Sequence, residues 1–358
     1  MRAGSTILSV AYPFAPVGPD AVGGAEQILT RLDHALTKAG HRSFVLGSER
    51  SRVHGTLIEV ALPRGPLDDR VRSAHHERYT AHLNAAVTRH RPDLVHCHGV
   101  DFYEYLPSPG VPVLVTLHLP FSYYHTDLTL IRRSHTYFHC VSDAQLASFP
   151  GLEGMLPPIP NGVPLTVKEP CRARDNFVLC LSRIAPEKNV HAALDAAKLA
   201  NVPLLLGGEV YPYREHETYF EEEVKPRLDS QRRFLGALEE ARKFDLLRRA
   251  RCLLQPSLAP ETSSLVAMEA LASGTPVVTY PSGALATIVK DGYTGFVVHD
   301  VGGMAEAIHR ADQINPNVCL AEAASRFGLD QMVQRYFSAY ERVIRPAEAV
   351  GRVLPGKR

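Results

Sequence analysis

The chain has 358 residues, of which 45% are hydrophobic and 22% charged, as in an ordinary globular protein long enough for two domains. Its formal net charge of +1 gives no general attraction for nucleic acid, so we expect no nucleic-acid partner and only local anion sites. No apolar run approaches the ~20 residues of a membrane-spanning helix, and the first residues lack a secretory-signal pattern. The six scattered cysteines are typical of a reducing compartment, which indicates a cytoplasmic protein, in solution or at the inner membrane surface.

The N-terminal half alternates short apolar runs with amphipathic stretches, the pattern of β-α-β units around a parallel sheet. A strand is predicted over residues 7–11, followed by a loop rich in proline and glycine. The next segment, 25–39, has apolar residues at helical spacing and ends before Gly40, which predicts a helix. Further predicted elements are strands at 44–46, 94–98, 113–117 and 137–141, and a helix around 79–87.

The proline-rich run 157–164 interrupts this pattern, because it can continue neither a helix nor a central strand. The alternation then restarts, with strands at 177–181, 204–206, 234–235, 252–255, 277–280 and 296–298, and helices at 190–200, 217–228 and 241–249. An amphipathic segment at 331–344 fits either a helix packing back across a neighbouring domain or an ordinary capping helix. We therefore predict two doubly wound α/β domains, 1–165 and 166–330, followed by a C-terminal helix within 331–358.

Two glutamates, Glu261 and Glu269, form the strongest chemical pattern, with seven residues between them. Thr262, Ser263 and Ser264 are favoured at helix N-caps, so we predict a helix that begins just after Glu261 and holds Glu269 two turns inside it. Free backbone N–H groups at such a start bind anions, which makes a phosphate beside the two serines plausible. Spacing alone leaves open the alternative of a capping acid and a solvated helix acid.

Arg183 and Lys188 lie in a predicted loop between a strand and a helix. Such loops follow the carboxyl ends of parallel strands, where open α/β sheets bind ligands. A planar guanidinium and a compact ammonium together suit a diphosphate. Viewed in isolation, a solvated surface loop explains the same stretch.

Taken together, these patterns resemble the retaining glycosyltransferases of family 4, also called glycosyltransferase group 1. That family has the GT-B fold, two Rossmann-like domains facing across a cleft. Its R-x4-K pair matches Arg183 and Lys188, and its E-x7-E motif followed by A-x-A-x-G-x-P-V matches residues 261–278. In the N-terminal half, residues 23–26 resemble its glycine-rich loop, His118 its histidine after a middle strand, and residues 160–163 its hinge.

The resemblance implies an enzyme that moves a sugar, as a hexosyltransferase, from a nucleoside-diphosphate sugar to a hydroxyl acceptor with retention of configuration. The acceptor would be a glycan, a lipid or a small molecule, and no cofactor is implied. Arg183 and Lys188 would neutralise the diphosphate. Glu261 would bind sugar hydroxyls, and Glu269 ribose hydroxyls.

The resemblance also implies roles for smaller residues. The backbones of Gly23 and Gly24 would approach the phosphates, and His118 would lie beside the transferred sugar near its anomeric centre. The donor site would further include Ser263, Ser264 and Leu265. The chain departs from the family pattern at Ser182 and Asn189, where Gly is usual, and at 262–264, where a Gly-rich stretch is common. These departures spare every charged group, so diphosphate binding is still implied, while the sugar pocket is less defined.

Metal use is not indicated, because the sequence contains no D-x-D motif, and we predict a metal-independent reaction. His96 and His98 would lie on one face of a strand, compatible with a metal, but a third ligand is not evident and a strand end bordering the acceptor cleft is preferred. The basic segment 70–91 fits contact with an anionic membrane less well than a solvated helix face. Residues 123–125 fit either an acceptor site or local packing.

Three rival functions are weighed against glycosyl transfer. A nucleotide-sugar 2-epimerase would share the architecture but change the sugar's stereochemistry without an acceptor. A dinucleotide-dependent oxidoreductase would need G-x-G-x-x-G after the first strand, which residues 7–24 lack. A non-catalytic nucleotide-sugar sensor would bind the donor tightly and transfer nothing.

Overall fold

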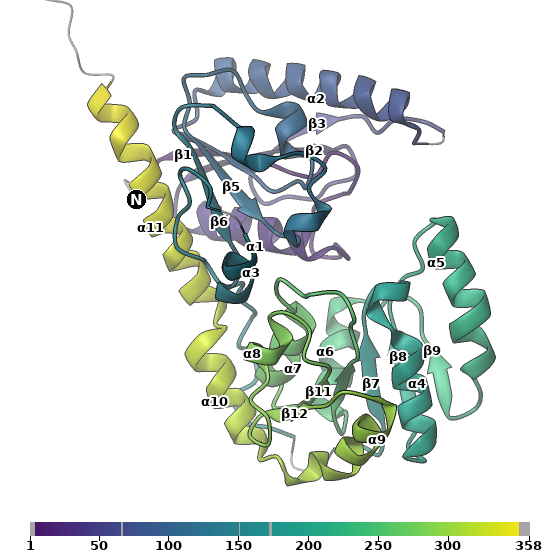
Figure 1. Ribbon diagram of the computed structural model, residues 1–358. Coiled ribbons are helices and arrows are strands. Elements are labelled where there is room, and N and C mark those ends of the chain that lie inside the picture. Colours follow the sequence, from purple (N-terminus) through teal and green to yellow (C-terminus); the bar gives the residue numbers. More distant parts are fainter. Residues whose placement is uncertain (1–3, 66, 150, 172–173, 351–358) are drawn as a thin grey trace, which may run out of the picture. The chain divides into compact units, whose positions relative to one another are not determined.

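The computed structural model describes residues 4–65, 67–149, 151–171 and 174–350, which form two compact units (Figure 1). Unit 1 runs up to Ile159 and resumes at Val333, whereas unit 2 comprises Pro160–Met332. Each unit contains a six-stranded sheet whose neighbouring strands are all parallel. The prediction of two doubly wound α/β domains is confirmed.

The sheet of unit 1 has the strand order β3-β2-β1-β4-β5-β6, which reverses between β1 and β4. Its strands are β1 (Thr6–Val10), β2 (Arg42–Ser48), β3 (Thr56–Val60), β4 (Leu94–Cys97), β5 (Val113–Leu117) and β6 (Thr136–Cys140). Five of these six were predicted from apolar runs. β3 was missed because it is a partly exposed edge strand without a continuous apolar run.

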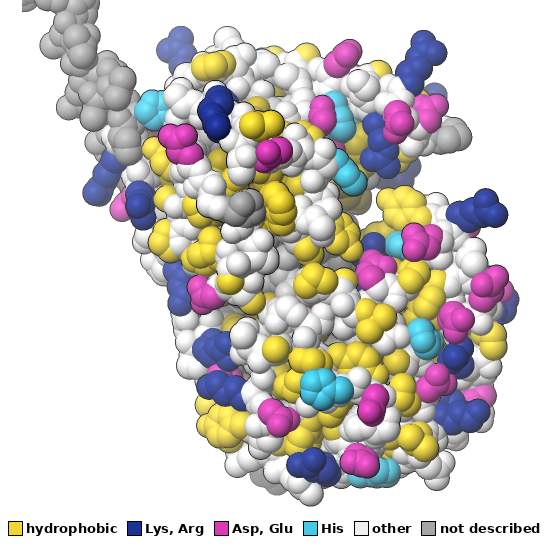
Figure 2. Space-filling view, viewed as in Figure 1, with side chains coloured by type: hydrophobic (Ala, Val, Ile, Leu, Met, Phe, Trp, Pro, Cys, Tyr) yellow, Lys and Arg dark blue, Asp and Glu magenta, His cyan; other side chains and the backbone are white. Residues whose placement is uncertain are grey.

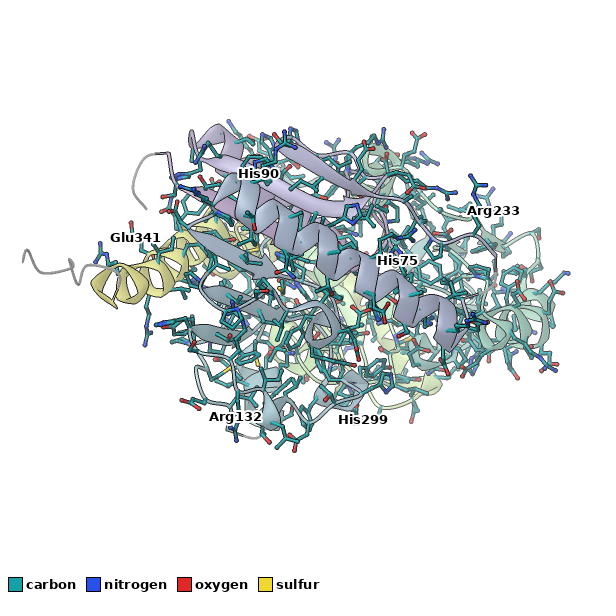
Figure 3. All side chains as sticks on the ribbon, turned by 90° about the horizontal axis from the view of Figure 1, so that it is seen from above. His75, His90, Arg132, Arg233, His299 and Glu341 are labelled. Carbon is teal, nitrogen blue, oxygen red and sulfur yellow. The ribbon has the colours of Figure 1, made fainter. Side chains whose placement is uncertain are left out.

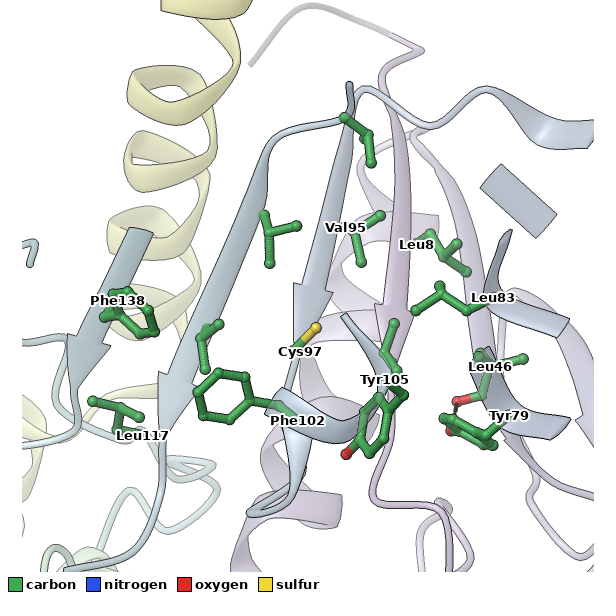
Figure 4. Close-up of a cluster of buried hydrophobic side chains, with 14 of the residues drawn as sticks. Leu8, Leu46, Tyr79, Leu83, Val95, Cys97, Phe102, Tyr105, Leu117 and Phe138 are labelled. Carbon is green, nitrogen blue, oxygen red and sulfur yellow. Dashed lines mark hydrogen bonds between the residues drawn. The ribbon is translucent and has the colours of Figure 1, made fainter. Parts of the chain in front are cut away.

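Helices cover both faces of this sheet, namely α1 (Gly24–Lys38), α2 (Asp69–His90), α3 (Asp143–Ser148) and α11 (Leu329–Val350) from Val333 onward. On the α2 side, Tyr79 and Leu83 pack with Val95 and Cys97 in the apolar cluster drawn in Figure 4. The Tyr79 hydroxyl lies within 3.0 Å of two backbone carbonyl oxygens, so its burial leaves no polar atom unpaired. This packing fixes α2 along one face of the sheet.

The basic segment predicted at 70–91 forms α2, and part of it serves unit 1 internally. His75 is buried with Nε2 3.4 Å from the Pro13 carbonyl oxygen, and His76 Nε2 lies 2.7 Å from Asp101 Oδ2. Figure 3 labels His75 and His90 on this helix, where the His90 ring packs 4.2 Å from that of Phe44. The helix is therefore not simply the solvated face that the sequence favours.

α11 begins within unit 2 and continues into unit 1. Tyr336 and Tyr340 are both fully buried in unit 1, and the Tyr340 hydroxyl lies 2.9 Å from Nδ1 of His96 in β4. Since Val95 and Cys97 face α2, this contact places α11 on the opposite face of the same sheet. The last helix is thus part of the core of unit 1.

Unit 2 has the strand order β12-β11-β10-β7-β8-β9, which reverses between β10 and β7. Its strands are β7 (Val178–Leu181), β8 (Leu204–Gly207), β9 (Arg232–Phe234), β10 (Leu253–Gln255), β11 (Val277–Thr279) and β12 (Gly295–Val297). Its helices are α4 (Val190–Leu199), α5 (Arg214–Tyr219), α6 (Glu240–Arg249), α7 (Leu265–Ala272), α8 (Leu285–Ile288), α9 (Val301–Arg310) and α10 (Pro316–Arg326). All six strands were predicted within two residues of their observed ends.

The surface carries charges of both signs. On the face seen in Figure 2, cationic and anionic side chains are interspersed with apolar ones. Among the helices that the structure describes, none combines the length and apolar character needed to cross a bilayer.

Candidate functional site

The cationic loop of unit 2 joins the end of β7 to α4, beside the point where the strand order reverses. A 3₁₀ turn at Pro186–Lys188 leads into Asn189, whose φ of 53° lies in the left-handed region. Asn tolerates that region better than most residues, which explains how it replaces the Gly usual in the resembling family. Its side-chain amide also donates to the Pro256 carbonyl oxygen at 3.1 Å, so the loop is tied to the end of β10.

The two predicted cations each have an anionic partner. Arg183 contacts Glu187 through Nη2 and Oε1 at 2.7 Å, and its guanidinium lies 5.7 Å from the ring centre of Tyr211. Lys188 Nζ lies 2.5 Å from Glu261 Oε1, although 73 residues separate them in the chain. The fold therefore brings the R-x4-K loop and the first glutamate of the E-x7-E motif together.

The helix predicted after Glu261 is α7, which begins at Leu265. Ser264, one of the three predicted capping residues, is its N-cap, and the Ser264 hydroxyl accepts from the Ala267 N–H at 3.3 Å. Glu261 lies before the helix, and its carbonyl oxygen accepts from the Ala284 N–H at 2.7 Å. Gly283 makes this arrangement possible, since it has a φ of +54° and an added Cβ would collide with the Glu261 backbone.

Ser263 stands outside the helix, in the loop before its N-cap. Its hydroxyl oxygen is buried and has no hydrogen-bond partner within the described part of the chain. Buried hydroxyls are normally paired, so this atom has an unused capacity for a ligand. Leu265, two residues further on, is buried as the first residue of α7.

Glu269 is the fifth residue of α7, little more than one turn inside the helix rather than the predicted two. Its side chain is fully buried, and Oε2 lies 2.8 Å from Nζ of Lys243 on α6. A buried carboxylate requires such a partner, because leaving it uncompensated costs several kcal/mol. Lys243 was missed from the sequence, since nothing distinguishes it locally from the other cations of a charged helix.

The glycines of unit 1 lie at the start of α1. Gly23 is the N-cap, without a side-chain cap, and Gly24 is the first helical residue. A Cβ on Gly23 would collide with Oε2 of Glu26, whose carboxyl group folds back over the glycine. Burial raises the pKa of Glu26. The space beside the Gly23 backbone, where a ligand was predicted to approach, is therefore occupied by the Glu26 carboxyl group.

His118 directly follows β5 and is partly buried. Its Nε2 lies 3.0 Å from Nδ1 of His98, and burial lowers the pKa of His118 to about 3. The aromatic residues after it divide, because Tyr124 is buried and its hydroxyl accepts from the Leu119 N–H at 3.4 Å, whereas Tyr123 is 41% exposed. Local packing therefore explains Tyr124 but not Tyr123.

Among the described residues, no group of three or more His, Cys, Asp or Glu side chains is arranged around an ion position. The ring nitrogens of His96 and His98 contact protein groups instead: the two rings pair with each other, with Tyr340 and Thr116, and with His118.

Two family models cover most of the chain. The model described as Glycosyltransferase Family 4 matches residues 22–166, and the one described as Glycosyl transferases group 1 matches residues 166–315. Glycogen synthase of Mycobacterium tuberculosis (strain ATCC 25618 / H37Rv) is 27% identical over 368 aligned positions, covering 84% of each chain. D-inositol 3-phosphate glycosyltransferase 2 of Catenulispora acidiphila is 36% identical over 127 positions, covering 33% of this chain and 29% of that protein.

Solved structures show the same fold at low identity. AviGT4, a glycosyltransferase involved in avilamycin A biosynthesis, superposes with a TM-score of 0.70 at 20% identity, covering 95% of this chain and 98% of its own. Anabaena Alr3699/HepE, solved in complex with UDP-glucose, gives a TM-score of 0.73 at 19% identity, covering 94% and 99%. These similarities show that the chain has the two-domain GT-B fold, with one Rossmann-like domain in each unit.

Proposed function

The chain belongs to the family 4, group 1 glycosyltransferases, and from this premise we propose that it transfers a hexose from a nucleoside-diphosphate sugar to a hydroxyl acceptor, with retention and without a metal. The observation that carries the proposal is the contact of Lys188 with Glu261 at 2.5 Å beside the end of β7. It joins a cation suited to the diphosphate and a carboxylate suited to sugar hydroxyls in one place. The structural relative solved with UDP-glucose supports this class of donor.

The chemistry follows from the charges that develop during transfer. The bond between the anomeric carbon and the diphosphate oxygen breaks, and a new bond forms from that carbon to the acceptor oxygen. Positive charge grows on the sugar and negative charge on the departing diphosphate. Arg183 and Lys188 would stabilise the diphosphate more in the transition state than in the ground state, which is the condition for faster turnover.

The acceptor proton must also leave. In a retaining transfer from the leaving-group face, the acceptor hydroxyl would give its proton to the departing phosphate oxygen, so no protein base is required. A diphosphate would compete with Glu261 for the Lys188 ammonium and release the carboxylate to accept from sugar hydroxyls. The Ser263 hydroxyl, which no group in the described ranges pairs with, offers a further hydrogen bond to the donor.

Unit 1 would contribute the remaining groups and the acceptor. Following the resemblance, Gly23 and Gly24 would present backbone to the phosphates, and His118 would act beside the sugar. We place the reaction in the cytoplasm, since five of the six cysteines, all but Cys171, are buried in the apolar core, as small hydrophobic residues are in a reducing compartment.

Donor binding tests the proposal directly. Calorimetric titration with UDP-, GDP-, ADP- and dTDP-sugars is expected to find one preferred donor, and Glu269→Gln is expected to weaken it about 10- to 100-fold, the value of hydrogen bonds to a charged group. The matched control is Glu322→Gln, which should leave donor affinity unchanged. Glu322 is a buried glutamate of α10 that pairs with Lys290 and with Arg326. Equal affinity in wild type and Glu269→Gln would remove Glu269 from the ribose site. A donor whose stereochemistry changes without any acceptor would indicate an epimerase.

Metal independence has its own test. Activity with the preferred donor is expected to survive an excess of a chelator, because fixed cations rather than a bound ion would stabilise the diphosphate. Turnover should be compared before and after chelation and after adding back Mg²⁺ or Mn²⁺. Loss of activity that either ion restores would overturn this part of the proposal.

A further inference from the structure

Unit 1 contains four histidines at the carboxyl ends of three neighbouring strands. His96 lies in β4 and His98 follows it, His118 follows β5, and His139 lies in β6. Hydrogen bonds join them into one chain through Thr116 of β5. His118 alone among the four is partly accessible, so the chain leads from the site region of unit 1 into its core.

The inner end of this chain fixes where each proton sits. His139 Nδ1 lies 3.0 Å from the Cys140 carbonyl oxygen, which can only accept, so Nδ1 carries the hydrogen. Nε2 of the neutral ring is then an acceptor, and the Thr116 hydroxyl donates its single proton to it at 2.7 Å. The Thr116 oxygen consequently accepts, from Nε2 of His96 at 2.7 Å and from the Tyr336 hydroxyl at 3.4 Å.

The same order continues outward. Because His96 carries its proton on Nε2, its Nδ1 is an acceptor, and the single lone pair of Nδ1 is shared by the Tyr340 hydroxyl at 2.9 Å and His98 Nε2 at 3.2 Å. An unprotonated His98 Nε2 would set two lone pairs against each other. His98 is therefore protonated on Nε2 and accepts on Nδ1, where the His118 Nε2 lies at 3.0 Å. Each hydrogen bond in the chain thus fixes which nitrogen of the next ring carries the proton. The last of them places the proton of His118 on Nε2.

This order requires neutral rings, and the surroundings provide them. Burial lowers the pKa of His139 to about 4 and of His118 to about 3, and holds the pKa values of His96 and His98 well below their ordinary range. The titratable groups that α11 presents to them are the phenols of Tyr336 and Tyr340, whose pKa values burial raises, so both are neutral as well. With all four rings neutral at pH 7, each hydrogen bond between neighbouring groups holds a single proton.

We propose that His98 is a positioning residue for His118, and that the chain anchored at the Cys140 carbonyl holds His118 as the Nε2–H tautomer with Nδ1 as its acceptor atom. His118 would then act on a sugar hydroxyl as a neutral hydrogen-bond acceptor, not as a general acid. That consequence for turnover rests on the proposed glycosyl transfer, whereas the tautomer order depends only on unit 1.

Nitrogen NMR of the full-length protein tests the order without any activity assay. In protein labelled with ¹⁵N-histidine at pH 7, the His118 signals, identified by their loss in His118→Gln, are expected to show a protonated Nε2 and an unprotonated Nδ1. A proton on Nδ1, or on both nitrogens, would overturn the proposal. The tautomer is read from the wild-type protein, and His118→Gln serves only to assign the signals.

A remote variant tests the coupling. Thr116→Val is nearly isosteric and removes the relay between His96 and His139, so His118 is expected to become a mixture of tautomers and turnover to fall about five- to tenfold, the value of one neutral hydrogen bond. The matched control is Tyr340→Phe, which deletes a side branch while His98 still donates to His96, so His118 should keep its tautomer. Unchanged His118 signals in Thr116→Val would refute the coupling. If the wild type transfers no sugar, the proposed function fails while the NMR outcome still decides the tautomer order.

Discussion

Replacing Lys188 with alanine is expected to lower turnover about 100-fold or more, the effect typical of removing a group that stabilises developing charge. Lys188 is only 22% exposed and is held against Glu261 at the end of β7, so water cannot readily replace its ammonium beside a departing diphosphate. The loss should fall mainly on kcat, because negative charge on the diphosphate grows in the transition state. Steady-state kinetics with the preferred donor measure it.

Two variants separate catalysis from simple loss of an ion pair. Lys290→Ala also breaks a contact between a lysine and a glutamate in unit 2, Lys290 Nζ to Glu322 Oε1 at 2.7 Å, and should leave turnover near that of the wild type. Lys188→Arg keeps the charge and should recover part of the activity. The role assigned to Lys188 would be untenable if Lys188→Ala turned over as fast as Lys290→Ala while both stayed folded.

Unit 1 is expected to lose stability steeply as the pH falls below about 6. His96, His98 and His139 are fully buried with lowered pKa values, so between those values and ~6.5 the unfolded chain binds protons that the folded chain refuses. Their stabilisation is complete above ~6.5 and is lost on acidification, by up to ~1.4 kcal/mol per pH unit for each ring. A combined loss of about 2–4 kcal/mol per pH unit is large against a typical domain stability of ~5–15 kcal/mol.

Urea denaturation between pH 7.5 and 4.5, with hydrogen exchange of β4 and β5 amides as a local probe of unit 1, gives the proton uptake from the slope. His139→Gln should reduce this uptake by about one proton. His82→Gln, at an exposed position of α2, should leave it unchanged. An uptake below one proton in the wild type would mean that the buried rings are charged at little cost.

The sequence predicts the fold well because central parallel strands are buried on both faces and read as apolar runs. β5 was predicted with its observed ends at 113 and 117, and all five of its residues are buried. β3 shows the limit of this signal, since an edge strand with exposed Thr56 and Glu59 contains no such run.

The candidate site was only partly readable from the sequence. Arg183, Lys188 and Glu261 were found because the motif fixes their spacing, and the structure brings Lys188 and Glu261 into contact. The exact start of α7 was not readable, because three adjacent residues favour the N-cap position and the structure uses the last of them, Ser264. Lys243 was missed because its partner Glu269 lies 26 positions further along the chain (from 243 to 269), and local patterns do not encode such a long-range contact.

α11 also determines when unit 1 can be completed during synthesis. The residues of unit 2 are continuous, so that unit can fold as soon as it has left the ribosome. Unit 1 emerges first, but Tyr336 and Tyr340, which fill the face of its sheet beside His96, are translated only after unit 2. The first half of the protein to be made is therefore the last to be finished, and a stop codon shortly after residue 330 would damage the N-terminal unit while sparing most of the C-terminal one.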